Sequence, residues 1–169
     1  MIAALDKFLS VTLATLMALM VADVTWQIFT RFVMNSPSGW TEELARYLLI
    51  WIGLLGAAWA YRRRAHLGLS YFVDRQSEAT RHRLGLFAHA MVAFFALAVM
   101  VYGGLQLVTL TFEMKQTSAA LGLPIGYVYC VLPLSGVLIT IYALDFIRRL
   151  ITGGDDLPPH DGLTAEDGD

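Results

Sequence analysis

The chain has 169 residues, of which 57% are hydrophobic and only 15% are charged. Soluble domains hold roughly 45–50% apolar and about 25% charged residues, and the apolar excess here is gathered in long runs. The composition therefore excludes an ordinary soluble domain and predicts an integral membrane protein. The single cysteine, Cys130, excludes an intrachain disulfide and a thiolate metal cluster.

Four runs are apolar and long enough to form membrane-spanning helices. They cover approximately residues 5–33, 44–61, 84–112 and 125–150. A spanning helix needs about 20 apolar residues, so the second run is short unless its polar beginning is included. The first run has no clean small-x-small cleavage site, so it is expected to be an uncleaved span and not a signal peptide. The sequence predicts an all-α integral membrane protein with four transmembrane helices.

Lysine and arginine are gathered at three places that four spans put on the same side of the membrane. These places are the N-terminus, the loop after the second run and the end of the fourth run, with Lys7, Arg62, Arg63, Arg64, Arg75, Arg81, Arg83, Arg148 and Arg149. The positive-inside rule then places both termini and the middle loop in the cytoplasm.

The middle loop and the C-terminal tail differ in composition from the spans. Residues 66–83 combine the apolar part "LGLSYFV" with a polar part rich in arginine. Such a segment is suited to lie amphipathically in the headgroup layer, near anionic phospholipids; the alternative is an ordinary basic loop. Residues 153–169 hold six of the fourteen acidic residues, with Gly and Pro, so disorder is expected there. A four-helix membrane domain is thus expected over residues 1–152.

The stretch "SGWTEELARYLLIWIGLLGAA" (38–58) places charged residues at the beginning of an apolar helix. Thr41 is the expected N-cap residue, which puts Glu42 and Glu43 in the first turn, where the helix dipole favours carboxylates. Arg46 follows the two glutamates by four and three residues, so it is expected to pair with one of them. Pairing reduces the cost of charge at the edge of a bilayer.

The first run carries two further charges, Asp23 and Arg31, toward the same side of the membrane. A structural ionic cluster is therefore expected from Asp23, Arg31, Glu42, Glu43 and Arg46. Two roles are open for it: the cluster marks an ion or proton pathway, or it neutralises itself and clamps two helices together. Because the cluster lies near the interface and holds both signs of charge, the clamp is the favoured interpretation.

The second run has two different faces at ~100° per residue. Gly53, Gly56 and Ala60 follow the charged pair on one face. Small residues let helices approach closely in lipid, so this face is expected to pack on another helix. The opposite face carries Leu55 and other bulky residues and is expected to meet lipid or a partner. The candidate partner interface is Trp40, Trp51 and Trp59.

Other residues of chemical interest lie in the third and fourth runs. His89 is either a proton relay or a hydrogen-bonded packing residue, with packing favoured, and no second histidine is placed to complete a haem site. Pro133 is expected to bend the fourth run, and Asp145 is expected to pair with Arg148 or Arg149. No nucleotide loop, metal-ligand spacing or nucleophile constellation is present. No cofactor or metal is therefore expected, and a membrane-bound enzyme is the least favoured class.

The densest motif resembles the signature of the small membrane subunit of tripartite ATP-independent periplasmic (TRAP) transporters. The run "RFVMNSPSGWTEELARYLLIWIGLLGAAWAYRRRAHLGL" has the Arg-aromatic-x-x-Asn, Trp-x-Glu-Glu-x-x-Arg and Gly-Ala-Ala patterns of that family. The matching positions are Arg31, Phe32, Asn35, Trp40, Glu42, Glu43, Arg46, Gly56, Ala57, Ala58 and His66. The later segment "LGLPIGYVYCVLPLSG" is also similar to the start of the family's last span, so the resemblance covers most of residues 5–150.

The resemblance implies a small permease subunit of a sodium-driven secondary transporter for organic anions, of dicarboxylate or sialic-acid type, in the bacterial inner membrane. The implied partners are a large multi-span subunit, a periplasmic substrate-binding protein and membrane phospholipids, with no nucleic acid. The small subunit is expected to brace and anchor the large one and to hold no substrate site of its own. The alternative is a self-contained small ion-coupled transporter that uses Asp23.

Overall fold

The computed structural model describes residues 2–36, 38–63 and 78–152, and these are helical apart from short connections. The helices are α1 (Ile2–Phe32), α2 (Gly39–Arg62), α4 (Glu78–Phe95), a π-helix η1 (Ala96–Gly103), α5 (Gly104–Glu113), α6 (Ile125–Tyr129) and α7 (Val131–Ile151). Within this part of the chain four helices are long and apolar enough to span a membrane: Ala3–Phe32, Gly39–Arg62, His82–Glu113 and Ile125–Ile151. The predicted all-α fold with four transmembrane helices is confirmed.

The predicted boundaries differ most at the second span. The helix begins at Gly39 and not near Leu44, so it includes its polar beginning and reaches a full spanning length. The interfacial segment expected over residues 66–83 lies largely outside the described residues, and its last part belongs to α4. The acidic tail, 153–169, lies wholly outside them.

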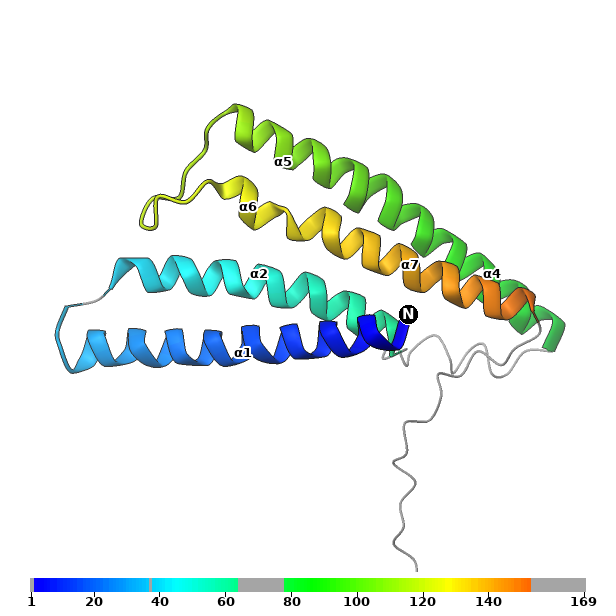
Figure 1. Ribbon diagram of the computed structural model, residues 1–169, viewed down its shortest axis with the longest axis horizontal. Helices are drawn as coiled ribbons and strands as arrows, with labels where there is room; N and C mark the ends of the chain where they lie inside the picture. Colours follow the sequence, from blue (N-terminus) through cyan, green and yellow to red (C-terminus); the bar gives the residue numbers. More distant parts are fainter. Residues whose placement is uncertain (1, 37, 64–77, 153–169) are drawn as a thin grey trace, which may run out of the picture.

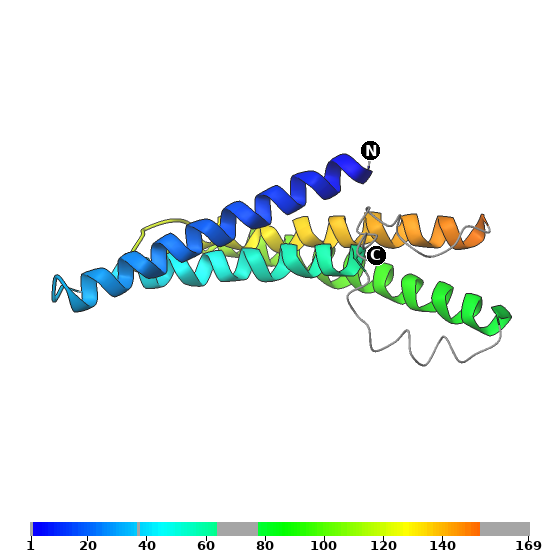
Figure 2. The same ribbon diagram turned by 90° about the horizontal axis from the view of Figure 1, so that it is seen from below.

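The four spans lie side by side in an open layer and do not close into a bundle (Figure 1). α1 packs on α2, α2 packs on α7, α7 packs on α4 and η1, and α5 packs on α6. The order across the layer is therefore α1, α2, α6–α7 and α4–η1–α5. Turned by 90°, the layer splays at one end, where α1 and α4 diverge (Figure 2).

The two ends of the layer differ in what they hold. One end, called the terminal end below, holds the start of α1 and the last turn of α7 (Figure 1). The other end, called the turn end, holds the connection from α1 to α2 and the loop over residues 114–124. Each end has its own set of polar contacts.

The buried core lies around α7, the most enclosed helix. In the fourth span, Ile125–Ile151, 44% of the residues in the most apolar stretch are buried, against 11% in each of the other three spans. The main cluster of buried apolar side chains draws on all four spans. Its members are Leu9, Leu55, Ala58, Ala96, Met100, Val131, Leu138, Ile139 and Tyr142.

The packing face of α2 is the reverse of the predicted one. Leu55 is 2% exposed and Ala58 is fully buried. By contrast, a Cβ added at Gly53 or Gly56 would meet no atom within 4 Å, and Ala60 is half-buried. Because α2 lies between α1 and α7, its bulky side chains fill the space toward these neighbours, as interiors are densely packed. The glycine face is left open within this chain.

Close approach at small residues occurs instead between α7 and the η1–α5 segment. A Cβ at Gly136 would lie 2.7 Å from the Cβ of Met100 and 3.1 Å from the carbonyl oxygen of Ala96. A Cβ at Gly104 would lie 3.0 Å from the Cδ of Pro133. These two glycines therefore allow the third and fourth spans to make the backbone-close contact that associates helices in lipid.

The helix of the fourth span is interrupted at Cys130, close to the proline at which a bend is predicted. α6 ends at Tyr129 and α7 begins at Val131, with Cys130 between them. Pro133 has no N–H group to donate, and a proline ring crowds the carbonyl group four residues earlier, here that of Tyr129. The interruption separates α6, which packs on α5 at the turn end, from the longer α7.

Candidate functional site

The motif "SGWTEELAR" (38–46) begins α2 at the turn end. Ser38, with φ −81° and ψ 111°, is the N-cap residue in place of the predicted Thr41, because the helix begins at Gly39. The hydroxyl oxygens of Ser38 and Thr41 lie 2.8 Å apart, and Ser38 Oγ lies 3.3 Å from Thr30 Oγ1. Thr41 is fully buried. A chain of three hydroxyl groups therefore joins the end of α1 to the start of α2.

Glu43 binds the loop that leads from α5 to α6. Its carboxylate accepts the backbone N–H groups of Ala119 at 3.2 Å, Ala120 at 2.8 Å and Leu121 at 3.0 Å, and the hydroxyl of Tyr47 at 2.7 Å. Successive backbone N–H groups in a turn form a concave anion site, and hydrogen bonds to a charged group are stronger than neutral ones. Glu43 therefore fastens α2 to the beginning of the fourth span.

Glu42 and Arg46 form the expected i,i+4 ion pair, with 3.7 Å between Oε1 and Nη2. Their side chains are 71% and 67% exposed. An exposed pair of this kind contributes roughly 0–1 kcal/mol to stability. The two adjacent glutamates thus have different roles, since only Glu43 is directed to the loop.

The predicted five-residue ionic cluster is divided in the structure. Among the described residues, Glu42 and Arg46 are the members that pair with each other. Asp23 is 7% exposed, and neither of its carboxylate oxygens has a hydrogen-bond partner there. Arg31 is exposed, with its guanidinium near the ring of the next residue. Eight residues turn a helix by about 80° beyond two full turns, so Asp23 and Arg31 lie on different faces of α1, the first buried and the second exposed.

A second ionic network, which is not predicted from the sequence, lies at the terminal end. Arg62 Nε lies 3.2 Å from Asp6 Oδ2, and Arg62 Nη1 lies 3.3 Å from Asp145 Oδ2. Asp145 also forms the expected pair with Arg149, at 3.0 Å. The Arg62 side chain is only 10% exposed, so the network that joins α1, α2 and α7 is shielded. The pattern in the sequence that could have indicated this network is one arginine and two aspartates near the ends of three spans on the same side of the membrane.

Two aromatic rings of α7 lie beside the Arg62 guanidinium, and one of them also contacts His89. Arg62 Cζ lies 5.6 Å from the ring centroids of both Tyr142 and Phe146, a distance that permits cation–π attraction. His89 Nδ1 lies 2.7 Å from the hydroxyl of Tyr61, and its ring stacks on Phe146 with 5.0 Å between centroids. His89 is therefore a hydrogen-bonded packing residue that joins α4 to α2 and α7.

The three tryptophans of the candidate partner interface differ in their surroundings. Trp40 is 44% exposed at the turn end. Trp51 and Trp59 are partly buried against the core of this chain, and the Arg63 guanidinium lies 4.7 Å from the Trp59 ring centroid. Their role toward a partner stays a prediction. In the described ranges, no three His, Cys, Asp or Glu side chains are grouped closely enough to hold a metal ion.

The sequence is similar to known transporter components over most of its length. The sequence model of the family described as tripartite ATP-independent periplasmic transporters, DctQ component, matches residues 9–153. The sialic acid TRAP transporter small permease protein SiaQ of Vibrio cholerae is 34% identical over 141 residues, which cover 80% of this chain and 77% of the relative. The C4-dicarboxylate TRAP transporter small permease protein DctQ of Rhodobacter capsulatus is 27% identical over 122 residues, which cover 72% of this chain and 53% of the relative.

A third relative is much longer. The isethionate TRAP transporter permease protein DctMQ of Oleidesulfovibrio alaskensis is 33% identical over 106 residues. The match covers 62% of this chain but only 16% of the relative. The similar segment is thus a small part of a larger permease in that organism.

Proposed function

Because the chain belongs to the DctQ component of the tripartite ATP-independent periplasmic transporters, we propose that it braces and anchors the large permease component of a sodium-driven transporter for organic anions. It is a small permease subunit and not an enzyme, and it is a multi-pass protein of the inner membrane. The relatives are named for sialic acid, a C4-dicarboxylate and isethionate, all of which are organic anions. We assign the substrate site to the large component.

A large permease component is the first proposed partner. The long DctMQ relative supports it, since a segment similar to this chain is joined there to a larger permease. A periplasmic substrate-binding protein and membrane phospholipids are the other proposed partners. With both termini in the cytoplasm, as the positive-inside rule favours, the turn end faces the periplasm. Glu43 and its loop then lie on the side where a binding protein delivers substrate.

The observation that carries the bracing role is the open layer of helices. A solute crosses a membrane through a route that protein encloses on several sides. The four described spans lie in one open layer that splays at one end, and these spans enclose no such route (Figures 1 and 2). Contacts of Glu43 fasten the layer at the turn end, and the Arg62 network fastens it at the terminal end. A layer held at both ends is suited to act as a rigid support.

Ion-coupled transport by this chain alone is the second candidate, and one observation favours it. Asp23 lies within the first span, is 7% exposed, and has no hydrogen-bond partner for its carboxylate among the described residues. Ionisable residues in such surroundings mark ion pathways in many membrane proteins. Asp23→Asn separates the two functions. The bracing role predicts retained transport by the assembled complex, whereas an ion-carrier role predicts its loss.

Reconstitution tests the proposal. The chain alone, the large component alone and both together are placed in liposomes with the binding protein, and uptake of labelled sialic acid, C4-dicarboxylate and isethionate is measured under an imposed sodium gradient. We expect uptake with both components together. Uptake by this chain alone would show that it has a substrate site. Full uptake by the large component alone, with unchanged stability, would show that it needs no brace.

A further inference from the structure

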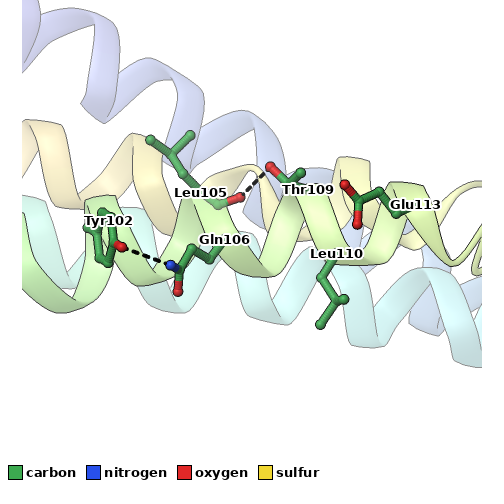
Figure 3. A pocket seen from close by; sticks show the side chains of 6 residues that line it. All are labelled: Tyr102, Leu105, Gln106, Thr109, Leu110 and Glu113. Atoms are coloured by element: carbon green, nitrogen blue, oxygen red, sulfur yellow. Dashed lines mark hydrogen bonds between the residues drawn. The ribbon is translucent and has the colours of Figure 1, made fainter.

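The outward face of the third span carries a polar stripe. Its members are Tyr102, Gln106, Thr109 and Glu113. They lie within ~60° of one another around the helix axis. All four are exposed, Tyr102 by 65%, and with two leucines they line a shallow groove (Figure 3). In hydrocarbon, a polar side-chain group without a partner in the protein carries a desolvation cost.

The stripe extends from the turn end into the apolar part of the span. At about 1.5 Å of rise per residue, Gln106 lies about 10 Å along the helix from Glu113. Gln106 Nε2 donates to the Tyr102 hydroxyl at 3.0 Å, and Thr109 donates to the carbonyl oxygen of Leu105 at 2.9 Å. The Gln106 amide oxygen and the Glu113 carboxylate remain without a hydrogen-bond partner in the described part of the chain.

Lipid tails cannot satisfy the Gln106 amide oxygen. Hydrocarbon tails offer no hydrogen bonds, and a glutamine side chain is too short to reach the headgroups from this depth as lysine or arginine can. Side chains that hydrogen-bond across helices are a recognised source of helix association in membranes. We propose that the polar stripe is the surface on which a transmembrane helix of the large permease component docks. The inference rests on the proposed function and adds the face that makes the contact.

The stripe also defines what the partner helix must carry. Opposite Gln106 it needs a group that both donates and accepts hydrogen bonds, and opposite Glu113 it needs a donor, such as arginine, lysine or a hydroxyl. A second copy of this chain does not fit. Both copies would cross the membrane in the same direction, so a twofold contact would bring two Glu113 carboxylates to the same depth, where they repel.

The position of the stripe in the layer suits docking from outside. α5 lies at the edge of the layer opposite α1, so a partner helix reaches the stripe without displacing another span (Figure 1). Gln106 and Tyr102 hold each other in place before the partner binds (Figure 3). This pre-ordering lowers the entropic cost of association.

Co-purification of the assembled complex tests the stripe. Gln106→Leu should lower the amount of co-purified large component several-fold, while the isolated subunit stays monodisperse, since an apolar side chain suits lipid. Thr25→Val on α1 is the matched control, because Thr25 is an exposed polar residue whose hydroxyl donates to the carbonyl oxygen of Val21 in its own helix, at 2.7 Å. A photo-cross-linking residue at position 106 should capture the large component.

The outcomes separate the two proposals. If the unmodified chain did not co-purify with the large component, the proposed function itself would fail. If the unmodified chain and Gln106→Leu bound the large component equally well, the function would stand and the docking surface would be rejected. Capture of only phospholipid, or of a second copy of this chain, at position 106 would also reject it.

Discussion

Two leucine truncations on one helix provide a direct test of how the layer is packed. Leu55→Ala is expected to destabilise the isolated subunit, whereas Leu49→Ala is expected to leave its stability unchanged. Leu55 is 2% exposed in the core, and Leu49 is 57% exposed on the same helix. The two variants lose identical atoms, so they differ only in what surrounds the side chain.

The expected loss is smaller than in a soluble protein. Lipid tails and detergent are as apolar as leucine, so the cost of transfer out of water is largely absent. What remains is the cavity: a volume of roughly 70 Å³, at about 24 cal/mol per Å³, costs about 1.7 kcal/mol. At Leu49 lipid fills the space, so we expect a change close to zero.

Thermal unfolding of the purified subunit in detergent measures this difference, with the loss of the monodisperse gel-filtration peak as the signal. Gly56→Leu is a third variant in the series. A Cβ at Gly56 would meet no atom within 4 Å, so the added side chain starts in open space and this variant should cost less stability than Leu55→Ala. If Leu49→Ala or Gly56→Leu lowered thermal stability as much as Leu55→Ala does, the glycine face would be the packing face of α2. The described arrangement of the helices would then be wrong.

Three further variants test the two ends of the layer and its centre. Glu43→Gln should speed hydrogen–deuterium exchange of the loop N–H groups that Glu43 binds, because a glutamine side chain has only one oxygen that can accept them. Glu42→Gln should leave this exchange unchanged. Equal effects of the two variants would show that Glu43 does not hold the loop. Gly136→Ala should cost about 1–3 kcal/mol in thermal unfolding by overpacking, and Gly53→Ala should be neutral or stabilising. No loss for Gly136→Ala would contradict the close approach. Arg62→Met should cost about 2–4 kcal/mol, because Asp6 loses its ion-pair partner and Asp145 keeps only Arg149, with partial recovery in Arg62→Lys. A fully stable Arg62→Met would show that the network contributes nothing.

Local rules in the sequence were sufficient for the helices themselves. An apolar run in lipid must satisfy its backbone groups within one helix, so the number and approximate positions of the spans followed from hydropathy. Pro133 predicted an irregularity of the fourth span, a bend, because a missing N–H group acts on its own helix; the helix is interrupted three residues earlier, at Cys130. The motif between Arg31 and His66 indicated the family, which the comparisons confirm.

Contacts between helices were harder to assign. The spacing of Glu43 and Arg46 allowed them to pair, but Glu43 instead accepts three backbone N–H groups from the loop between α5 and α6. Backbone partners leave no mark in side-chain patterns. Similarly, Arg62 was assigned to the basic loop that orients the chain, whereas its side chain connects α1 and α7.

The sequence by itself determined the membrane class, the four spans and the family. Only the tertiary structure decided which face of α2 is buried, that Glu43 holds a loop, and that Arg62 joins three helices. The physical reason is that lipid tails and a protein interior are equally apolar. Hydrophobicity therefore reports that a residue lies in the membrane, but not whether its neighbour is lipid or another helix, and the order of helices across the layer supplies that second fact.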